Sequence, residues 1–247
     1  MLHVLATPIG NLEDLSARAL RVLREADAVV SEDTRTTLKL LSHHGIRKPV
    51  IAYFQHSPPR RLEEILRRLR DGRTLALVTE SGTPGVSDPG SMLVEAALEA
   101  GIAVSPVPGP CALAAAASVC GFAVDAFHFA GFLPRKPGKR RKALAALAGL
   151  GVTLVFFESP HRLAASLEDM LAALGDRRMT LCRELTKRHE EVKRTTVAKA
   201  LGRFRAEEPR GEFTLAVEGS PSEAPRRRGP KEGLPPAELE AEEEREA

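Results

Sequence analysis

A turn of small residues that follows a short apolar run is well suited to bind a ligand. Residues 75–78 are apolar throughout, as in a strand buried on both faces, and TESGTPGVSDPG follows them. Gly82, Gly85 and Gly90 allow the backbone to approach a ligand closely, and the prolines restrict the loop. Ligands bind at such loops because these lie outside the carboxyl ends of strands in open α/β sheets. A rigid structural turn explains the same residues.

Strand-like and helix-like segments alternate over residues 1–108, which predicts a doubly wound α/β domain. Strands are expected at 3–6, 28–30, 49–54, 75–78 and 103–106. One helix is expected from Ser16 to about residue 26, and a second passes through Leu41 and ends near residue 45. A third is expected over 60–71, and a fourth ends at residue 100. The strands ending near residues 6, 30 and 78 lead into polar or Gly/Pro loops, so one sheet edge collects the chemistry. No G-x-G-x-x-G follows the first strand, which argues against a dinucleotide site.

The sequence PVPGP at residues 106–110 is the clearest break in the chain. A second α/β domain is expected over residues 109–219, with strands at 127–132, 153–157, 179–182 and 212–217. One helix is expected over 111–119, and a second from 143 to about 150. A third ends at residue 174, and a fourth is expected over 197–204. Short connections favour more antiparallel pairing here. Residues 133–142 are expected to form a loop dense in positive charge.

Composition and charge exclude several classes of protein. The 247-residue chain is 43% hydrophobic and 28% charged, which is typical of a globular protein. No apolar run approaches the roughly 20 residues of a membrane span, and the start lacks signal-peptide features, so the cytoplasm is expected. Three cysteines outside any C-x-x-C pair and seven scattered histidines predict no disulfide framework and no metal site.

The charge is divided unevenly along the chain. Residues 220–247 hold eight Glu and five Lys or Arg, which leaves a net charge of +6 on residues 1–219. The basic part permits an anionic partner such as RNA. Residues 220–247 contain almost no large apolar side chain, so we expect a disordered charged tail outside the fold.

Eight motifs, in this order, resemble those of one family. They are TPIGNLEDLSARAL, SEDTRTT, SGTPGVSDPG, VPGP, GFLPRK, FFESPHR, RELTK and GEF. The set resembles the tetrapyrrole methylase superfamily over residues 1 to about 218. Within it, the motifs are most similar to members that methylate the ribose 2′-hydroxyl of a cytidine in small-subunit ribosomal RNA. The resemblance implies two α/β domains with S-adenosylmethionine in the cleft between them, and a homodimer.

The resemblance also implies which residues contact S-adenosylmethionine. Pro8 would close the first strand against the cofactor, and the turn after residue 78 would carry its adenosine and methionine parts on backbone groups. The full set is Pro8, Glu80, Ser81, Gly82, Thr83, Pro84, Val86, Ser87, Cys111, Ala112, Phe132, Phe157, Leu185, Phe213 and Thr214. Glu80 stands where the family usually has Asp, and Cys111 where it usually has Ser. Cysteine forms a weaker hydrogen bond than serine, but the backbone cradle remains.

Methyl transfer to a ribose hydroxyl requires in-line positioning and a group that helps to remove a proton from a weak acid. Asp33, Glu158, Glu184 and Lys187 are candidates for that proton, and Arg35 and Arg183 are suited to phosphate. Each proton candidate has a structural alternative. Asp33 and Glu158 could cap helices, Glu158 could pair between domains, and Glu184 could pair with Lys187.

The basic segment is the expected RNA contact, through Arg135, Lys136, Lys139, Arg140 and Arg141, because neutralising phosphates provides most nucleic-acid affinity. A solvated basic loop is the alternative. One Tyr and no Trp leave little for base stacking, so a folded RNA, as in the assembled small subunit, is the expected substrate. Three other functions remain open: a tetrapyrrole or corrin precursor methyltransferase, a non-catalytic S-adenosylmethionine or nucleotide sensor, and a structural RNA-binding protein.

Overall fold

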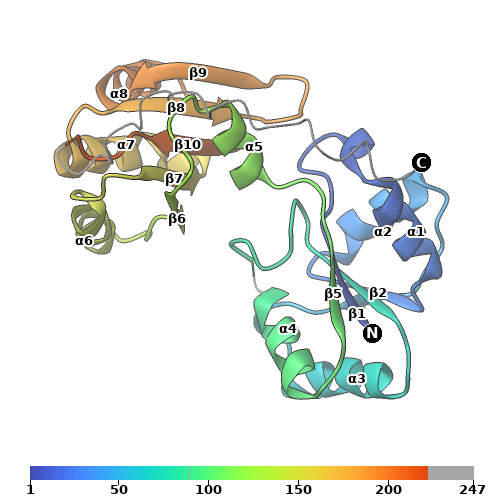
Figure 1. Cartoon of the computed structure of the whole chain (residues 1–247). Helices are drawn as coiled ribbons and strands as arrows, with labels where there is room; N and C mark the ends of the chain where they lie inside the picture. Colours follow the sequence, from blue (N-terminus) through green and yellow to red (C-terminus); the bar gives the residue numbers. More distant parts are fainter. Residues whose placement is uncertain (89, 222–247) are drawn as a thin grey trace, which may run out of the picture.

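Short apolar runs form a five-stranded parallel sheet in the first half of the chain. The computed structural model describes residues 1–88 and 90–221 (Figure 1). The strands are β1 (Leu2–Leu5), β2 (Ala28–Ser31), β3 (Val50–Ala52), β4 (Leu75–Val78) and β5 (Val104–Val107), in the order β3-β2-β4-β1-β5. Each neighbouring pair is parallel. Because β2 and β4 are buried on both faces, they consist of apolar and small residues.

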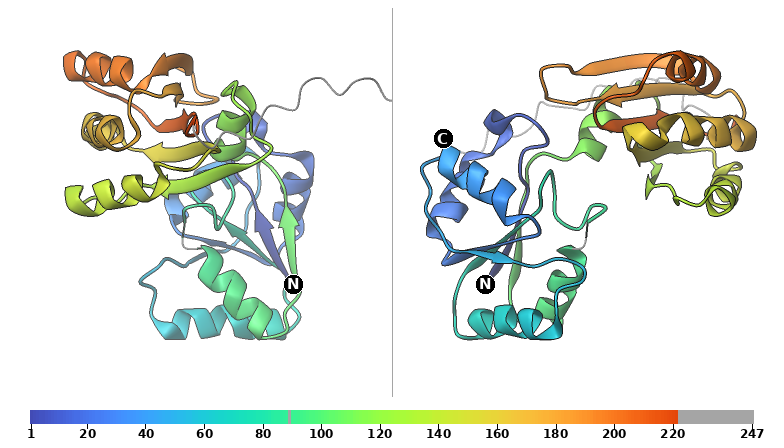
Figure 2. Two further views of the ribbon diagram at one scale, coloured as in Figure 1. Left: turned by 60° about the vertical axis from the view of Figure 1, so that its left-hand side comes forward. Right: turned by 180° about the vertical axis from the view of Figure 1, so that it is seen from behind.

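Helices cover both faces of this sheet, which confirms the doubly wound arrangement (Figures 1 and 2). One face packs against α1 (Ala17–Glu25) and α2 (Thr34–His43), and the other against α3 (Pro59–Arg70) and α4 (Gly90–Glu99). The side chain of Ser16 caps α1 by accepting a hydrogen bond from the Ala19 amide at 3.1 Å, as its residue type predicts. A short 3₁₀ turn, η1 (Leu12–Asp14), lies in the loop after β1.

The second sheet is mostly antiparallel, as the short connections predicted. Its strands are β6 (Phe127–Phe132), β7 (Thr153–Glu158), β8 (Arg178–Arg183), β9 (Glu191–Thr196) and β10 (Phe213–Val217), in the order β6-β7-β10-β8-β9. Only the β6–β7 pair is parallel. The strand β9 was not predicted, because it lies at a sheet edge and its central residues are exposed and polar.

Four helices accompany the second sheet: α5 (Ala112–Val119), α6 (Pro137–Leu147), α7 (Pro160–Leu174) and α8 (Val197–Ala206). Side chains of α6, α7 and α8 form one apolar core with the sheet, whereas α5 contacts β10 and lies toward the first half of the molecule (Figure 1). The predicted loop over 133–142 is wrong in its second part. Pro137 occupies the first turn of α6, where a missing amide hydrogen does no harm.

The connection between the two sheets coincides with the PVPGP break. The strand β5 ends at Val107, and α5 begins at Ala112. The division into domains at residues 108 and 109 stays a prediction. The predicted tail falls outside the described residues from 222 onward, but Ser220 is buried and its amide bonds the Leu150 carbonyl. Among the described residues, every helix is too short or too polar to cross a bilayer.

Candidate active site between the two sheets

A cavity of about 490 Å³ lies between the loops of the first sheet and the ends of strands in the second. That volume is within the range of small-molecule sites, which is about 300–1,000 Å³. The first half lines it with Ile9, Glu32, Thr79, Glu80, Ser81, Gly82, Thr83, Val86, Ser87 and Asp88, and the second half with Cys111, Ala112, Phe132, Phe157, Glu158, Ser159, Pro160, Glu212, Phe213 and Thr214.

The turn after β4 is held in place by the loop after β1. The amides and carbonyls of Thr7 and Gly82 exchange two backbone hydrogen bonds, at 2.8 and 3.1 Å. The hydroxyl of the buried Thr7 also donates to the Thr79 carbonyl at 3.1 Å. Gly82 adopts a φ of 86°, a conformation that favours glycine. These contacts fix the first part of the turn as a rigid wall of the cavity.

The same turn reaches the second half of the molecule at two points. The hydroxyl of Thr83 donates to the Pro110 carbonyl at 3.1 Å. Ser87, with a φ of 64°, packs against Gly131 so closely that a Cβ atom there would lie 2.7 Å from the Ser87 hydroxyl. Asp88 shapes this part by accepting hydrogen bonds from the amides of Gly85 and Gly90. The turn after β4 therefore links the two halves of the molecule beside the cavity.

Aromatic side chains and two helix ends form the opposite wall. The ring of Phe157 makes edge contacts with Phe129 and Phe132, and Phe132 is 52% exposed at the mouth of the cavity. The N-cap residues of α5 and α7, Cys111 and Ser159, both line the cavity, and neither side chain makes a capping hydrogen bond. At α7 the Ser159 amide already donates to Glu158 and Pro160 has no amide hydrogen, so the positive end of α5 is the one better suited to a polar group of a ligand.

Glu158 lies at this wall but is engaged by its own helix. Its side chain is 0% exposed, and its two carboxylate oxygens accept hydrogen bonds from the Ser159 amide at 2.8 Å and the Ser166 hydroxyl at 2.5 Å. Arg162 lies 3.4 Å away as an ion-pair partner. The structure therefore favours a structural role for Glu158 at the start of α7 over acceptance of a substrate proton.

Glu184 and Lys187 form the salt bridge that their spacing allowed. The Lys187 ammonium donates to Glu184 at 2.9 Å and to Glu212, a cavity residue, at 2.8 Å. Burial alone would lower the pKa of Lys187, but these hydrogen bonds outweigh it and raise the pKa. Burial raises the pKa of Glu184, but its hydrogen bonds lower that pKa by more, so the pKa is lowered overall. Lys187 is thus a cation that braces the site and has no free electron pair to accept a proton.

Asp33 and Arg35 lie at the start of α2. The Asp33 carboxylate accepts a hydrogen bond from the Arg35 amide at 2.8 Å, and this bond is the main reason why its pKa is lowered. The Arg35 side chain is 88% exposed, with its guanidinium 3.5 Å from Asp33. Neither residue lines the cavity. Asp33 therefore acts as the helix cap that the sequence offered as its alternative role.

Comparisons with known proteins agree on one family. A family model for Tetrapyrrole (Corrin/Porphyrin) Methylases matches residues 1–201. Ribosomal RNA small subunit methyltransferase I of Halalkalibacterium halodurans is 46% identical over 219 residues, covering 89% of this chain and 76% of the relative. Its counterpart in Thermotoga maritima is 45% identical, covering 88% of this chain and 98% of the relative. The chain belongs to the tetrapyrrole methylase family.

A solved structure also shares the fold of this protein. Uroporphyrin-III C-methyl transferase from Thermus thermophilus, complexed with S-adenyl homocysteine, superposes with a TM-score of 0.62 at 22% identity. The match covers 87% of this chain and 96% of that structure. The resemblance expected from the eight motifs is confirmed, and so is the two-sheet α/β architecture.

Most of the cofactor residues expected for a tetrapyrrole methylase are brought together in the structure. The exceptions are Pro8, Pro84 and Leu185, which lie outside the cavity lining. Pro8 is buried in the loop after β1, and Pro84 is buried in the turn after β4. The residues that line the cavity are Glu80, Ser81, Gly82, Thr83, Val86, Ser87, Cys111, Ala112, Phe132, Phe157, Phe213 and Thr214. Their role in cofactor binding stays a prediction.

Several residues that line the cavity of this protein were not predicted from the sequence. They are Ile9, Glu32, Thr79, Asp88, Ser159, Pro160 and Glu212. All lie within two positions of predicted site residues in sequence, so position within the motifs was the available signal. Glu32 is the most consequential, because its pKa is raised by burial and then by the charges of Glu80 and Asp88. Residue types alone favoured its neighbour Asp33 as a proton acceptor.

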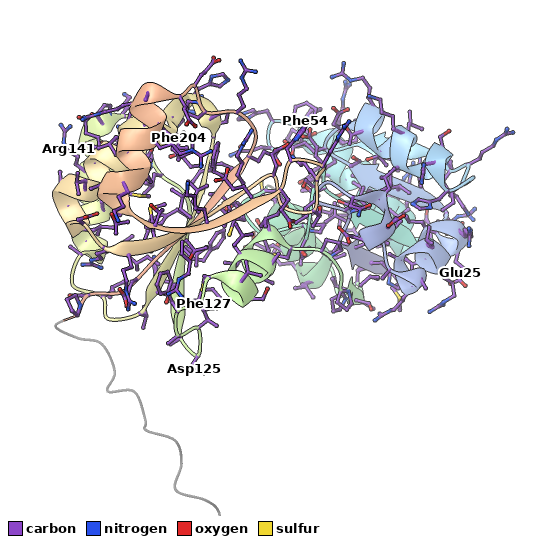
Figure 3. The ribbon with its side chains drawn as sticks, turned by 90° about the horizontal axis from the view of Figure 1, so that it is seen from above. Glu25, Phe54, Asp125, Phe127, Arg141 and Phe204 are labelled. Carbon is purple, nitrogen blue, oxygen red and sulfur yellow. The ribbon has the colours of Figure 1, made fainter. Side chains whose placement is uncertain are left out.

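The predicted RNA contacts divide into exposed and buried residues. Arg135, Lys136, Lys139 and Arg141 are exposed around the start of α6, and Figure 3 shows Arg141 at the outer edge of the second half. Arg140 is different, because its side chain is only 7% exposed and donates to Asp169 of α7 at 2.7 Å. The prediction that Arg140 contacts phosphate is therefore wrong: Arg140 shares a helix face with the buried Leu144, four residues later, and this face packs against α7.

Proposed function

We propose that this protein transfers a methyl group from S-adenosylmethionine to the ribose 2′-hydroxyl of a cytidine in small-subunit ribosomal RNA, in the cytoplasm. The observation that carries the proposal is the cavity between the two sheets, in a chain that is 45–46% identical to ribosomal RNA small subunit methyltransferases I. The names of those relatives support the RNA substrate. The S-adenyl homocysteine bound to the uroporphyrin-III methyltransferase supports the cofactor.

The cavity residues fit S-adenosylmethionine by their chemistry. The backbone groups of Ser81 and the amide of Thr83 suit the polar edges of the cofactor, and Phe132 and Phe157 offer apolar surface to its adenine. Uncapped amides at the start of α5 suit its carboxylate. When bound, S-adenosylmethionine supplies an electrophilic methyl group on a cationic sulfur. The protein then has to orient the hydroxyl, exclude water and accept a proton.

The RNA would bind along the mouth of the cavity and the basic surface beside it. Arg135 and Lys136 follow the cavity residue Phe132 within four positions, so their charges lie near the mouth. Among the described residues, no carboxylate pairs with Arg135, Lys136 or Lys139, which leaves these cations available to phosphates. Shape and charge would thus position an assembled subunit while one nucleotide enters the cavity.

A tetrapyrrole precursor fits the cavity less well. Glu32, Glu80 and Asp88 line one wall, and a uroporphyrin-like substrate carries several carboxylates of the same charge. In the RNA reading, the nucleoside that enters the cavity carries no carboxylate, and its phosphates stay at the basic rim.

Transfer of labelled methyl from S-adenosylmethionine to small ribosomal subunits isolated without this enzyme would test the proposal. After alkaline digestion, label in an alkali-resistant dinucleotide that contains cytidine is expected, because a 2′-O-methyl group blocks cleavage. Absence of label from the subunits, with cofactor binding intact, would overturn the RNA assignment. Light scattering would test the homodimer that the resemblance implies, for which twice the 26.7 kDa mass of one chain is expected.

A further inference from the structure

We infer that Glu32 accepts the proton of the substrate hydroxyl, an inference that rests on the proposed methyl transfer. As the hydroxyl oxygen bonds to the methyl carbon, the carbon–sulfur bond breaks and sulfur keeps its electron pair. The hydroxyl proton passes to a carboxylate oxygen of Glu32, which later releases it to solvent. Sulfur ends neutral and the ribose ends as a methyl ether, so charge and atoms balance.

Most carboxylates of the described cavity wall are already engaged. Two backbone amides hold one oxygen of Asp88, and the Ser159 amide and the Ser166 hydroxyl hold Glu158. Glu212 accepts a hydrogen bond from Lys187. Such contacts occupy carboxylate lone pairs that would otherwise be available to the proton of a substrate. Within residues 1–88 and 90–221, the cavity carboxylates without a hydrogen bond or ion pair are Glu32 and Glu80.

Position separates Glu32 from Glu80. Glu32 follows β2 and borders both the main cavity and a small cavity of about 10 Å³, which it shares with Tyr53, Thr79 and Asp88. The groups facing it are therefore two carboxylates, Glu80 and Asp88, and the buried phenol of Tyr53, whose pKa burial raises. No cation is among them. A carboxylate in such surroundings holds a proton more strongly than usual, as a general base requires.

The side chain of Glu32 is also open to solvent in the free protein, so a substrate can reach it. An RNA nucleotide and cofactor that fill the cavity would exclude water and increase its affinity for a proton further. Glu80 then acts as a positioning residue through its charge: it raises the basicity of Glu32 without accepting the proton.

Glu32→Gln tests this assignment directly, with Glu95→Gln, an exposed glutamate of α4, as the matched control. In single-turnover transfer to small subunits, Glu32→Gln should be slower by about 100- to 10,000-fold, the usual contribution of a general base. Its affinity for S-adenosylmethionine, measured by calorimetry, should be unchanged. Wild-type rates in Glu32→Gln, or a loss of cofactor affinity equal to the loss of rate, would overturn the inference.

Thermal unfolding gives a readout that is independent of activity. Because the pKa of Glu32 is raised in the folded state, its charge disfavours folding above that pKa, and the penalty disappears below the usual pKa of about 4.3. Glu32→Gln should therefore unfold at a higher temperature than wild type at pH 7.5, and the difference should shrink at acidic pH. A structural carboxylate predicts the opposite, and a lower unfolding temperature for Glu32→Gln would contradict the inference.

Glu80→Gln supplies a second test of the same base. Removing this neighbouring charge should lower the pKa of Glu32 and move the acid limb of the single-turnover pH profile to lower pH. An acid limb unchanged by Glu80→Gln would show that another group titrates. Wild-type protein that transfers no methyl to subunits would overturn the proposed function and this inference together, whereas transfer by both wild type and Glu32→Gln overturns the inference alone.

Discussion

The aliphatic part of Lys187 lies against Gly10 so closely that Gly10 has no room for a side chain. Lys187 belongs to the loop after β8, and Gly10 belongs to the loop after β1, so the contact joins the two halves beside the cavity. Figure 2 shows the loop between β8 and β9 reaching toward the first half. Glu184 and Glu212 hold the ammonium of Lys187 at 2.9 and 2.8 Å. This contact sets the separation of the two cavity walls on one side.

Gly10→Ala should weaken catalysis because the new methyl group would displace Lys187 and widen the cavity. Misplacement of reacting groups by about 1 Å can reduce a rate about 100-fold. We expect a loss of methyl transfer of about that order and weaker binding of S-adenosylmethionine. Gly138→Ala is the matched control, since nothing lies within 4 Å of a Cβ atom there. Equal activity of Gly10→Ala and Gly138→Ala would show that the contact does not set the cavity.

Glu158→Gln should affect stability more than the chemistry. The buried carboxylate receives the Ser159 amide and the Ser166 hydroxyl, and the variant would leave Arg162 without its ion-pair partner. We expect a loss of about 1–3 kcal/mol in the free energy of unfolding, measured by urea denaturation. The pH profile of single-turnover transfer should keep its wild-type shape. A profile that loses its acid limb in Glu158→Gln would instead make Glu158 the base.

Replacing the exposed cations at the start of α6 should weaken RNA binding and its dependence on salt. For the triple variant Arg135→Ala, Lys136→Ala and Lys139→Ala, the slope of log affinity against log salt should decrease in magnitude by about 2 to 3, because each phosphate contact contributes close to one. Filter binding to small subunits over a salt series measures it. Unfolding should be little affected, since these side chains are exposed.

Arg140→Ala provides the contrast from the same helix. This variant removes the close partner of the buried Asp169 and leaves it only the exposed Arg141 at 3.6 Å, which should cost up to about 3–5 kcal/mol of stability. For the fraction of Arg140→Ala protein that folds, the slope of log RNA affinity against log salt should match that of wild type. A reduced slope with unchanged stability would restore Arg140 to the RNA contacts.

Stability should decrease as pH falls below about 6.5, partly because of His44. Burial, together with the charges of His43 and Arg24, lowers the pKa of His44 in the folded state, and its buried Nε2 has no hydrogen-bond partner among the described residues. The unfolded chain therefore binds a proton first, and protonation favours unfolding between the usual pKa of about 6.5 and the lower folded value. His3 acts in the same direction.

Thermal unfolding from pH 7.5 to pH 5.0 measures this effect. The decrease should be smaller in His44→Asn than in wild type, and unchanged in His56→Asn, an exposed histidine. Identical pH dependence of wild type and His44→Asn would exclude His44 as a source of the decrease.

Local patterns in the sequence were sufficient for most elements and for the place of the site. The apolar run of β4 has the predicted bounds, Leu75–Val78, and so does β6, Phe127–Phe132. The turn after β4 lines the cavity, as its glycines and its position at a strand end indicated. Such features depend on residues close together in the chain, and the eight motifs supplied the family independently.

Roles that depend on distant residues were decided only by the tertiary structure. Arg140 looked like its exposed neighbours until Asp169 of α7 was placed against it. Ser166 and Arg162 engage Glu158, and the α2 amide of Arg35 engages Asp33, whereas Glu32 and Glu80 remain open to the cavity. Burial and charge neighbours set the pKa and hydrogen-bonding capacity of each group, and the packing of the two sheets determines both.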